Sequence, residues 1–418
     1  MNKYWLYLEP YTIIFSQEEE FLAYNSISFK SRVFKNISRL REIISQLILI
    51  ENMYCIDLSE DDIQLEEVKE FIIFIRSSFS GDLLKSAKIK RPSIFPPVLK
   101  FQYDINNKDS ADFRNIKEDI INLLDEVYIY VGGDDPSSSL NGINVFQQFD
   151  YCKSTEGNYL AYQKLKYFIN SLKDCHIINL NLVGGNIFTH PDLNILIDDF
   201  NKLPFNKSIY ASYKDIPTNF KKNPFLNDSK YTIRVLIDFP ISQQILFEAI
   251  QFLIDNNCRF ESLFAITSAI EFEIAEAIID KLELEHVEIK PVYTGENIDF
   301  FKKYIFLSEK DLLSSKITRK EIFINQSMNI SNFGKIRIMT NGEVYSDLNN
   351  HSIGDINTPL LNLIYNAMRN PKEWMRIRNQ KPCNRCIYQW ICPSPSGYEH
   401  AIGKNNLCTV KRDPQEYL

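Results

Sequence analysis

The chain has 418 residues, of which 44% are hydrophobic and 24% are charged, so it is neither disordered nor fibrous and is long enough for two or three domains. Its formal net charge of -7 argues against nucleic acid as a partner, because duplex binding relies on cations that neutralise phosphates. The sequence has no secretory-signal pattern and no apolar run long enough for a membrane span, so we expect a cytoplasmic protein.

Residues 1–92 are expected to form a small domain in which short strands precede helices. Helical periodicity runs over 38–48, and Ser59 is a suitable N-cap for a second helix with an acidic first turn. Three prolines at 91–97 mark the end of this domain. Three segments favour strands because they are rich in aromatic and β-branched residues, namely 4–15, 21–25 and 32–35.

A second domain is expected over 93–305, where strand-like and helical runs alternate. Such alternation predicts parallel strands joined by right-handed crossovers, and therefore an α/β fold. Six units of this kind would build a partial (β/α)6 barrel, although a doubly wound sheet fits the same periodicity. The predicted strands are 127–131, 176–183, 208–212, 231–238, 262–267 and 286–292.

The last domain, 306–418, begins with a predicted β-hairpin and contains four of the eight cysteines. The hairpin is indicated by Asn341-Gly342, a pair that favours a tight two-residue turn. The four cysteines follow the spacing Cys383-x2-Cys386-x5-Cys392-x15-Cys408. In a reducing compartment, a cluster of this kind is typical of a metal site rather than of disulfides.

Four thiolates suit either an iron–sulfur cluster or structural zinc, and the spacing alone leaves both open. Cys392 is followed by proline, which is common at the end of loops that bind clusters. Basic residues near the cysteines would offset the negative charge of such a site; they are Lys381, Arg385, Lys404, Lys411 and Arg412.

The segment PCNRCIYQWICPSPS (382–396) resembles the end of SPASM domains in peptide-modifying radical-SAM maturases, and GEVY (342–345) and SIGDI (352–356) resemble their opening. From its KYWLYLEPY start (3–11) onward, the whole chain is similar to the pseudo-radical-SAM proteins of ribosomal-peptide (RiPP) maturation systems. The resemblance implies a radical-SAM-like partial barrel between a winged-helix-like N-terminal domain and a SPASM-like cluster domain.

The resemblance also implies one [4Fe–4S] cluster rather than the usual two. Cys383, Cys386, Cys392 and Cys408 match all four ligands of the cluster nearer the C-terminus. The other cluster needs cysteines where this chain has Ser396 and, after the hairpin, Ser346 and Asp347, and its cysteine in the glycine segment is absent too.

The catalytic motif of radical-SAM enzymes is missing. Those enzymes carry C-x3-C-x2-C after the first barrel strand, whereas here Gly132-Gly133 follows and the next cysteine is Cys152. One thiolate cannot hold a catalytic cluster, so we expect no SAM cleavage and assign no catalytic residue. Vestiges of the SAM-contacting Gly-Gly-Glu-Pro motif are expected at Gly184, Gly185, Asn186 and Ile187.

The N-terminal domain resembles the peptide-recognition elements of RiPP systems, which implies that a leader peptide adds to a sheet edge as an extra strand. A domain that only packs on the barrel would have the same layout. The candidate edge, with the following helix completing the groove, is Ser31, Arg32, Val33, Phe34 and Lys35.

The resulting hypothesis is an accessory, non-SAM-cleaving protein of RiPP maturation that binds a precursor peptide, carries one cluster and partners a radical-SAM maturase. A first alternative is an active peptide-modifying oxidoreductase that uses the C-terminal cluster with Cys152 or with Asp134 and Asp135. A second alternative is a zinc-stabilised peptide-binding scaffold.

Overall fold

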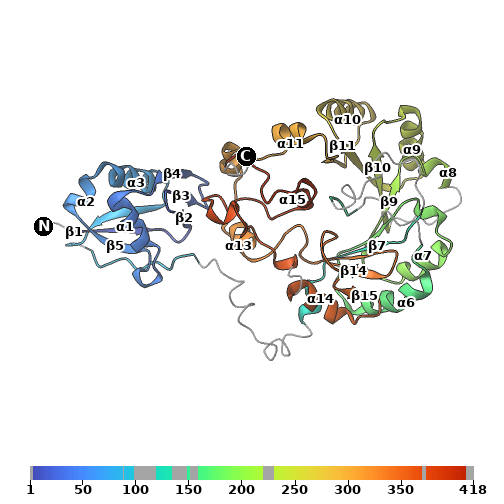
Figure 1. The fold of residues 1–418 in the computed structure, drawn as a ribbon, viewed down its shortest axis with the longest axis horizontal. Helices are drawn as coiled ribbons and strands as arrows, with labels where there is room; N and C mark the ends of the chain where they lie inside the picture. Colours follow the sequence, from blue (N-terminus) through green and yellow to red (C-terminus); the bar gives the residue numbers. More distant parts are fainter. Residues whose placement is uncertain are drawn as a thin grey trace.

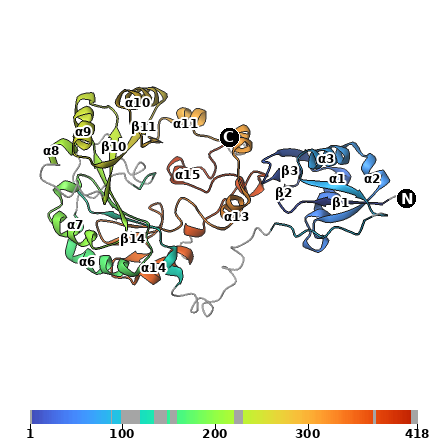
Figure 2. The same ribbon diagram turned by 180° about the vertical axis from the view of Figure 1, so that it is seen from behind.

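The computed structural model describes residues 3–87, 89–97, 119–133, 148–150, 159–219, 230–369 and 373–410. Two three-stranded sheets form the N-terminal part, and a nine-stranded sheet forms the centre of the larger part. These parts lie at opposite ends of the molecule, with the C-terminal segment between them (Figures 1 and 2). The candidates Asp134, Asp135, Cys152, Lys411 and Arg412 lie outside the described residues.

The N-terminal part contains six short antiparallel strands rather than three. The strand predicted over 4–15 is two strands in different sheets, because a turn at Pro10 interrupts it. Proline has no amide hydrogen to donate to a ladder, which explains the break. One sheet has the order β5 (Cys55–Ser59), β1 (Lys3–Leu8), β6 (Gly81–Lys85), and the other has the order β2 (Thr12–Ser16), β3 (Glu20–Asn25), β4 (Ser31–Lys35).

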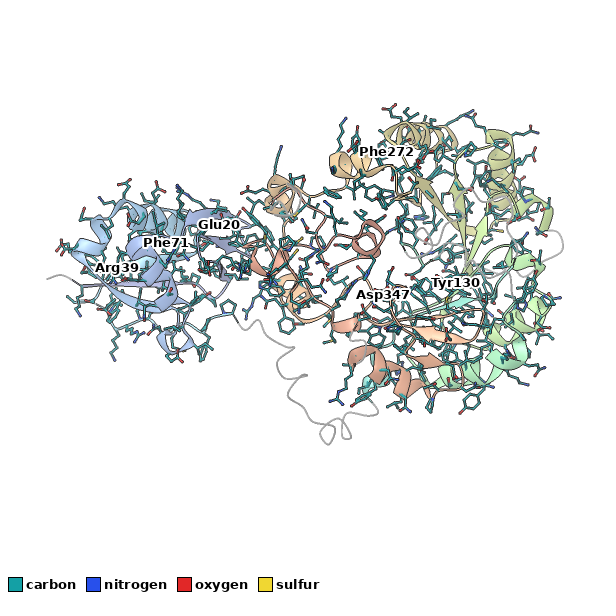
Figure 3. The ribbon with its side chains drawn as sticks, viewed as in Figure 1. Glu20, Arg39, Phe71, Tyr130, Phe272 and Asp347 are labelled. Carbon is teal, nitrogen blue, oxygen red and sulfur yellow. The ribbon has the colours of Figure 1, made fainter. Side chains whose placement is uncertain are left out.

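Three helices pack with these sheets: α1 (Ser38–Leu47), α2 (Glu60–Gln64) and α3 (Glu66–Ser77). Ser59 caps α2 as predicted, through a reciprocal capping box with Asp62. The helix expected beyond Ser59 breaks at Leu65, whose backbone is extended. Figure 3 shows Phe71 of α3 inside this part, where it meets Phe21 and Phe34 in edge-to-face ring contacts.

The central sheet contains all six predicted parallel strands, so the chain is a mixed α/β protein with a mostly parallel central sheet. The strands lie side by side in chain order, from β7 to β12. A doubly wound sheet reverses its strand order at a switch point, so that alternative does not fit. The strands are β7 (Glu126–Tyr130), β8 (Asn179–Val183), β9 (Asn206–Ser212), β10 (Tyr231–Asp238), β11 (Arg259–Ile266) and β12 (Val287–Pro291).

Alternate residues of these strands face opposite sides. On β7, Val127 and Ile129 enter the main hydrophobic core, which the crossover helices cover, whereas Tyr128 and Tyr130 face the other side. We call this other side the inner face of the sheet. The helices on the covered side are α6 (Tyr162–Ser171), α7 (Leu193–Asn201), α9 (Gln243–Asp255) and α10 (Ala269–Leu282), and the one-turn α8 (Ile216–Asn219) follows β9.

The sheet continues beyond β7 into the C-terminal third of the chain. β13 (Lys335–Ile338) pairs parallel with β7, and the predicted hairpin at Asn341-Gly342 joins it to β14 (Glu343–Tyr345) and then β15 (Gly354–Asp355). One hydrophobic core therefore includes residues on both sides of position 305. The division into domains 1–92, 93–305 and 306–418 stays a prediction.

The remaining helices lie in the last third of the chain. They are α11 (Ile298–Tyr304), α12 (Glu309–Ser314), α13 (Arg319–Ser327), α14 (Leu360–Arg369) and α15 (Gly397–Ile402). Among the helices of the described ranges, none combines the length and apolar character that crossing a bilayer requires.

Candidate functional site

The four C-terminal cysteines lie on loops and one short turn. Cys383 opens a 3-10 turn (Cys383–Arg385), and Cys386 follows directly after it. Cys408 lies opposite Leu307, where the returning chain forms an isolated parallel bridge. Cys383 is buried, and the other three cysteines are half-buried.

Three of the thiols share one electrostatic environment. Burial raises the pKa of Cys383, the Arg378 guanidinium opposes that rise, and Cys408 adds to it. Burial also raises the pKa of Cys392 to about 12, again opposed by Arg378 and increased by Cys383 and Cys408. Without a metal, Cys383 and Cys392 are therefore neutral thiols at physiological pH.

Arg378 is the cation at these thiols, and the sequence analysis did not single it out. Its guanidinium forms an ion pair of 2.7 Å with Glu399, and both side chains are less than 10% exposed. It also donates hydrogen bonds to the carbonyl oxygens of Pro393, Ser394 and Asn405. A guanidinium held by four hydrogen bonds in this way is fixed beside the cysteines.

Glu399 also caps the start of α15, and the sequence contains the usual signature of that cap. Ser396 and Glu399 form a capping box at the start of α15, in which the Ser396 amide donates to the Glu399 carboxylate at 2.8 Å. The pattern of serine followed three residues later by glutamate is the usual signature of such a helix start. Ser396 is thus engaged in capping α15.

The donor chemistry of this segment fits a thiolate-bound metal, but the ligand set is not assembled. Sulfur donors suit zinc and iron–sulfur clusters. In the parts of the chain that the structure describes, however, no three or more His, Cys, Asp or Glu side chains are placed as a group that could hold a metal ion. Binding would require the cysteines to converge further than they do here.

The segment that carries the C-terminal cysteines packs against the N-terminal sheet made of β2, β3 and β4. Ile387, Tyr388 and Ile391 form one buried cluster with Ile13, Phe15, Leu22 and Tyr24 of β2 and β3, and Cys386 and Cys392 pack against it. The other side of β3 enters the N-terminal core through Phe21 and Ala23. The second three-stranded sheet is therefore enclosed between its own helices and the cysteine segment.

The predicted peptide-binding residues form β4, the edge strand of that sheet. The Asn25 amide donates to the Lys30 carbonyl, and the Asn36 amide donates to the Glu19 carbonyl. These two hydrogen-bonded residue pairs lie at the two ends of the β3–β4 ladder and continue its register. Bonded and non-bonded pairs alternate in antiparallel ladders. The backbone groups of Arg32 and Phe34 therefore face β3, whereas those of Ser31, Val33 and Lys35 face the open edge.

Helix α3 runs beside this edge. The sequence analysis expected the helix directly after β4, which is α1, to complete the groove, but α3 supplies the contacts described here. Glu70 pairs with Arg32 at 2.5 Å, and the Ser77 carbonyl accepts from the Lys30 ammonium at 3.2 Å. Ile73 lies on the same face of α3 as Glu70 and Ser77 and is 64% exposed. An open backbone edge and an exposed apolar side chain thus lie next to each other.

The predicted vestige of the SAM motif lies in the loop after β8, against the loop after β7. Gly133 has φ +124°, and a Cβ there would lie 2.4 Å from the Asn186 carbonyl oxygen; a Cβ at Gly184, with φ +149°, would lie 2.9 Å from that of Gly132. Asn186 donates to Asp215 at 3.0 Å and accepts from the Phe188 amide. Loop-to-loop packing is therefore sufficient to explain Gly133 and Gly184.

Comparisons with known proteins give distant structural likenesses only. No protein-family model and no curated protein matches the chain. Streptococcus suis SuiB bound to S-adenosylmethionine is 12% identical with a TM-score of 0.47, over 98% of this chain and 99% of that one. The AdoMet-bound anSMEcpe structure is 12% identical with a TM-score of 0.46, over 68% and 92%. SuiB bound to precursor peptide SuiA is 13% identical with a TM-score of 0.42, over 98% and 99%.

Proposed function

We propose that this chain is an accessory protein of ribosomal-peptide maturation that binds a precursor peptide and does not cleave SAM. The N-terminal part is a winged-helix-like peptide-recognition domain, and it binds the leader peptide at β4. The central sheet is a degenerate partial (β/α)6 barrel that acts as a scaffold, and a SPASM-like segment holds one [4Fe–4S] cluster at Cys383, Cys386, Cys392 and Cys408. A radical-SAM maturase is the proposed partner.

The observation that carries the proposal is the open edge of β4. Ser31, Val33 and Lys35 direct their amide and carbonyl groups outward, as strand addition by a peptide requires. Exposed Ile73 on α3 offers an apolar contact for a side chain of the added strand. Main-chain hydrogen bonds would give affinity, and the α3 contact would give sequence preference.

The accessory role is supported by the missing thiols. No cysteine occurs between β7 and Cys152, so the loop that would carry a catalytic cluster has no ligand set for it. The Gly184–Ile187 segment uses Asn186 for internal hydrogen bonds, where the glutamate of the related motif would contact SAM. Both features favour binding over catalysis.

The peptide edge is tested by hydrogen exchange of the full-length protein with and without its precursor peptide. We expect slower exchange at the amides of Ser31, Val33 and Lys35, which face the edge, and little change at Arg32 and Phe34, which are already bonded to β3. Val33→Pro removes one outward donor at an edge position that tolerates proline, and should weaken peptide binding at least tenfold. Lys85→Ala on β6 is the surface control variant.

Undiminished peptide binding by folded Val33→Pro, or protection confined to other segments, would remove β4 as the peptide site. Mass spectrometry of the peptide after incubation with this protein alone tests the accessory role in the same samples. A changed peptide mass would replace it with the oxidoreductase alternative.

The metal centre is tested by iron, sulfide and zinc content after anaerobic purification, with Cys386→Ala beside the wild type. Four iron and four sulfide per chain, lost in the variant, is the expected result for one [4Fe–4S] cluster. Cys258→Ala, a half-buried cysteine of the central part, is the control and should leave the metal content unchanged. One zinc without sulfide would support the scaffold alternative instead.

A further inference from the structure

Residues 148–150 come from the long connection between β7 and α6, yet they lie on the inner face of the central sheet. Phe149 is 7% exposed and belongs to a buried cluster with side chains from four parallel strands. These neighbours are Tyr128, Tyr130, Val183, Tyr210, Leu263 and Ala265. Figure 3 shows Tyr130 within this interior, on the side of the sheet away from the crossover helices.

Gln148 attaches one end of this segment to the far side of the sheet. Its side-chain amide donates to the Tyr293 carbonyl at 2.8 Å and accepts from the Tyr293 amide at 2.8 Å. Tyr293 lies just beyond the end of β12, the sheet's last parallel strand. The Gln148 side-chain amide thus satisfies both backbone groups of Tyr293.

Asp150 attaches the other end through charge. Its carboxylate pairs with Arg337 of β13, with one oxygen 3.1 Å from the guanidinium, and its carbonyl accepts a hydrogen bond from Tyr130. Arg337 is only 4% exposed at its side chain, so this buried cation is compensated by a carboxylate whose side chain is 21% exposed. A buried guanidinium needs such a partner, because an uncompensated buried charge is costly.

The aromatic ring between these two ends meets a third element. Phe149 contacts Tyr398 of α15 edge-to-face at 5.8 Å between ring centroids. The Tyr398 hydroxyl in turn donates to the Pro291 carbonyl at the end of β12 at 2.7 Å. The three residues thus bridge β7, β12, β13 and α15.

The segment occupies the place where α/β proteins bind their ligands. Tyr130 and Val183 are the last residues of β7 and β8, and Ala265 is the penultimate residue of β11. Ligands of such folds bind at the carboxyl ends of parallel strands. Here the chain itself fills that position with an amide, an aromatic ring and a carboxylate.

We propose that Gln148, Phe149 and Asp150 form an intramolecular plug in a peptide-binding site that accepts an aromatic residue followed by an acidic one. Tyr128, Tyr130, Tyr210 and Tyr398 would contact the aromatic ring, and Arg337 would bind the carboxylate. An external peptide has to displace the plug before it can bind. The proposal rests on the contacts of residues 148–150 alone and is independent of both the β4 edge and the cysteine centre.

The test is a titration of the full-length wild type and of Phe149→Ala with the dipeptide N-acetyl-Phe-Asp-amide, followed by calorimetry and by melting temperature. We expect the dipeptide to bind Phe149→Ala and raise its melting temperature, and to leave the wild type unchanged. N-acetyl-Ala-Asp-amide, which lacks the ring, and N-acetyl-Phe-Asn-amide, which lacks the charge, should each bind at least tenfold more weakly.

A natively folded Phe149→Ala protein that ignores the dipeptide, or a wild type that binds it equally well, would overturn the proposal. If Phe149→Ala does not fold, Gln148→Ala provides the test, because it releases the half-buried end of the plug and keeps the ring. Binding to Gln148→Ala at least tenfold tighter than to the wild type supports the plug. Equal binding, or binding to neither protein, contradicts it.

Discussion

The Tyr24 hydroxyl donates a 2.6 Å hydrogen bond to the Ile317 carbonyl, which lies 293 positions later in the chain. Tyr24 is on β3, and Ile317 lies just before α13, so the bond joins the N-terminal sheet to the segment that leads to the cysteines. Tyr24 is also part of the buried cluster with Ile387 and Ile391. The sheet that contains β4 and the segment that carries the cysteines are therefore parts of one packed unit.

Tyr24→Phe should lower the free energy of unfolding by about 1 kcal/mol, because it removes the hydroxyl and leaves the Ile317 carbonyl without this donor. Tyr167→Phe is the matched control, since that side chain is 67% exposed on α6. Urea unfolding of the two variants measures the difference. A loss in the control as large as that in Tyr24→Phe would argue against a specific contribution from this bond.

Arg378→Met should cost about 3–5 kcal/mol of unfolding free energy, because it leaves the Glu399 carboxylate buried without its cation. The double variant Arg378→Met/Glu399→Met should recover part of that loss, less about 1 kcal/mol for the helix cap that Glu399 provides. Lys3→Ala, which breaks an ion pair exposed on both sides, should cost at most about 1 kcal/mol.

Denaturant unfolding of the metal-free proteins keeps ligand binding out of this comparison. If Arg378→Met alone is as stable as the wild type, Glu399 takes up a proton or another partner at no cost in free energy.

Glu373 should make the protein less stable as the pH rises from about 4.5 to about 7. Burial raises the pKa of Glu373 to about 7, Arg376 opposes that rise, and Asp347 adds to it. The folded protein thus holds a proton that the unfolded chain releases above its ordinary pKa of 4.5. The stabilisation is complete below pH 4.5 and is lost as the pH rises through the folded pKa, amounting to up to about 3 kcal/mol.

Glu373→Gln, which mimics the protonated form, should remove this part of the pH dependence. Unfolding free energies of both proteins measured from pH 4.5 to 8 give the difference, in which the other titrating groups cancel. Parallel curves for the two proteins would show that Glu373 titrates normally.

The sequence predicts the parts of this fold that depend on local pattern. The six parallel strands have clear periodicity, and all six lie in the central sheet. Strands β5 and β6 were missed because they are short and are stabilised by pairing with the distant β1. The strand expected over 4–15 was wrong because aromatic content outweighed Pro10 in that prediction.

The candidate site shows the same division between local and distant information. The spacing of the cysteines is readable in the sequence, as is the cap formed by Ser396 and Glu399. The role of Arg378 is not, because it depends on the chain returning through 394–405 to place carbonyl groups and Glu399 around the guanidinium. Likewise, no pattern brings Phe149 to the inner face of the sheet; only the tertiary contacts do.

Gly133→Ala should destabilise the protein far more than Gly295→Ala, although both glycines have positive φ. At Gly133, with φ +124°, a methyl group would lie 2.4 Å from the Asn186 carbonyl oxygen, so the loops after β7 and β8 would have to separate. At Gly295, with φ +91°, no atom of the described residues beyond its chain neighbours lies within 4 Å of the added methyl group, so only the backbone preference is lost. We expect a loss of about 1 kcal/mol for Gly295→Ala and at least twice that for Gly133→Ala, measured by urea unfolding. Equal losses would mean that the loops after β7 and β8 separate easily, and that their packing does not explain the glycine at position 133.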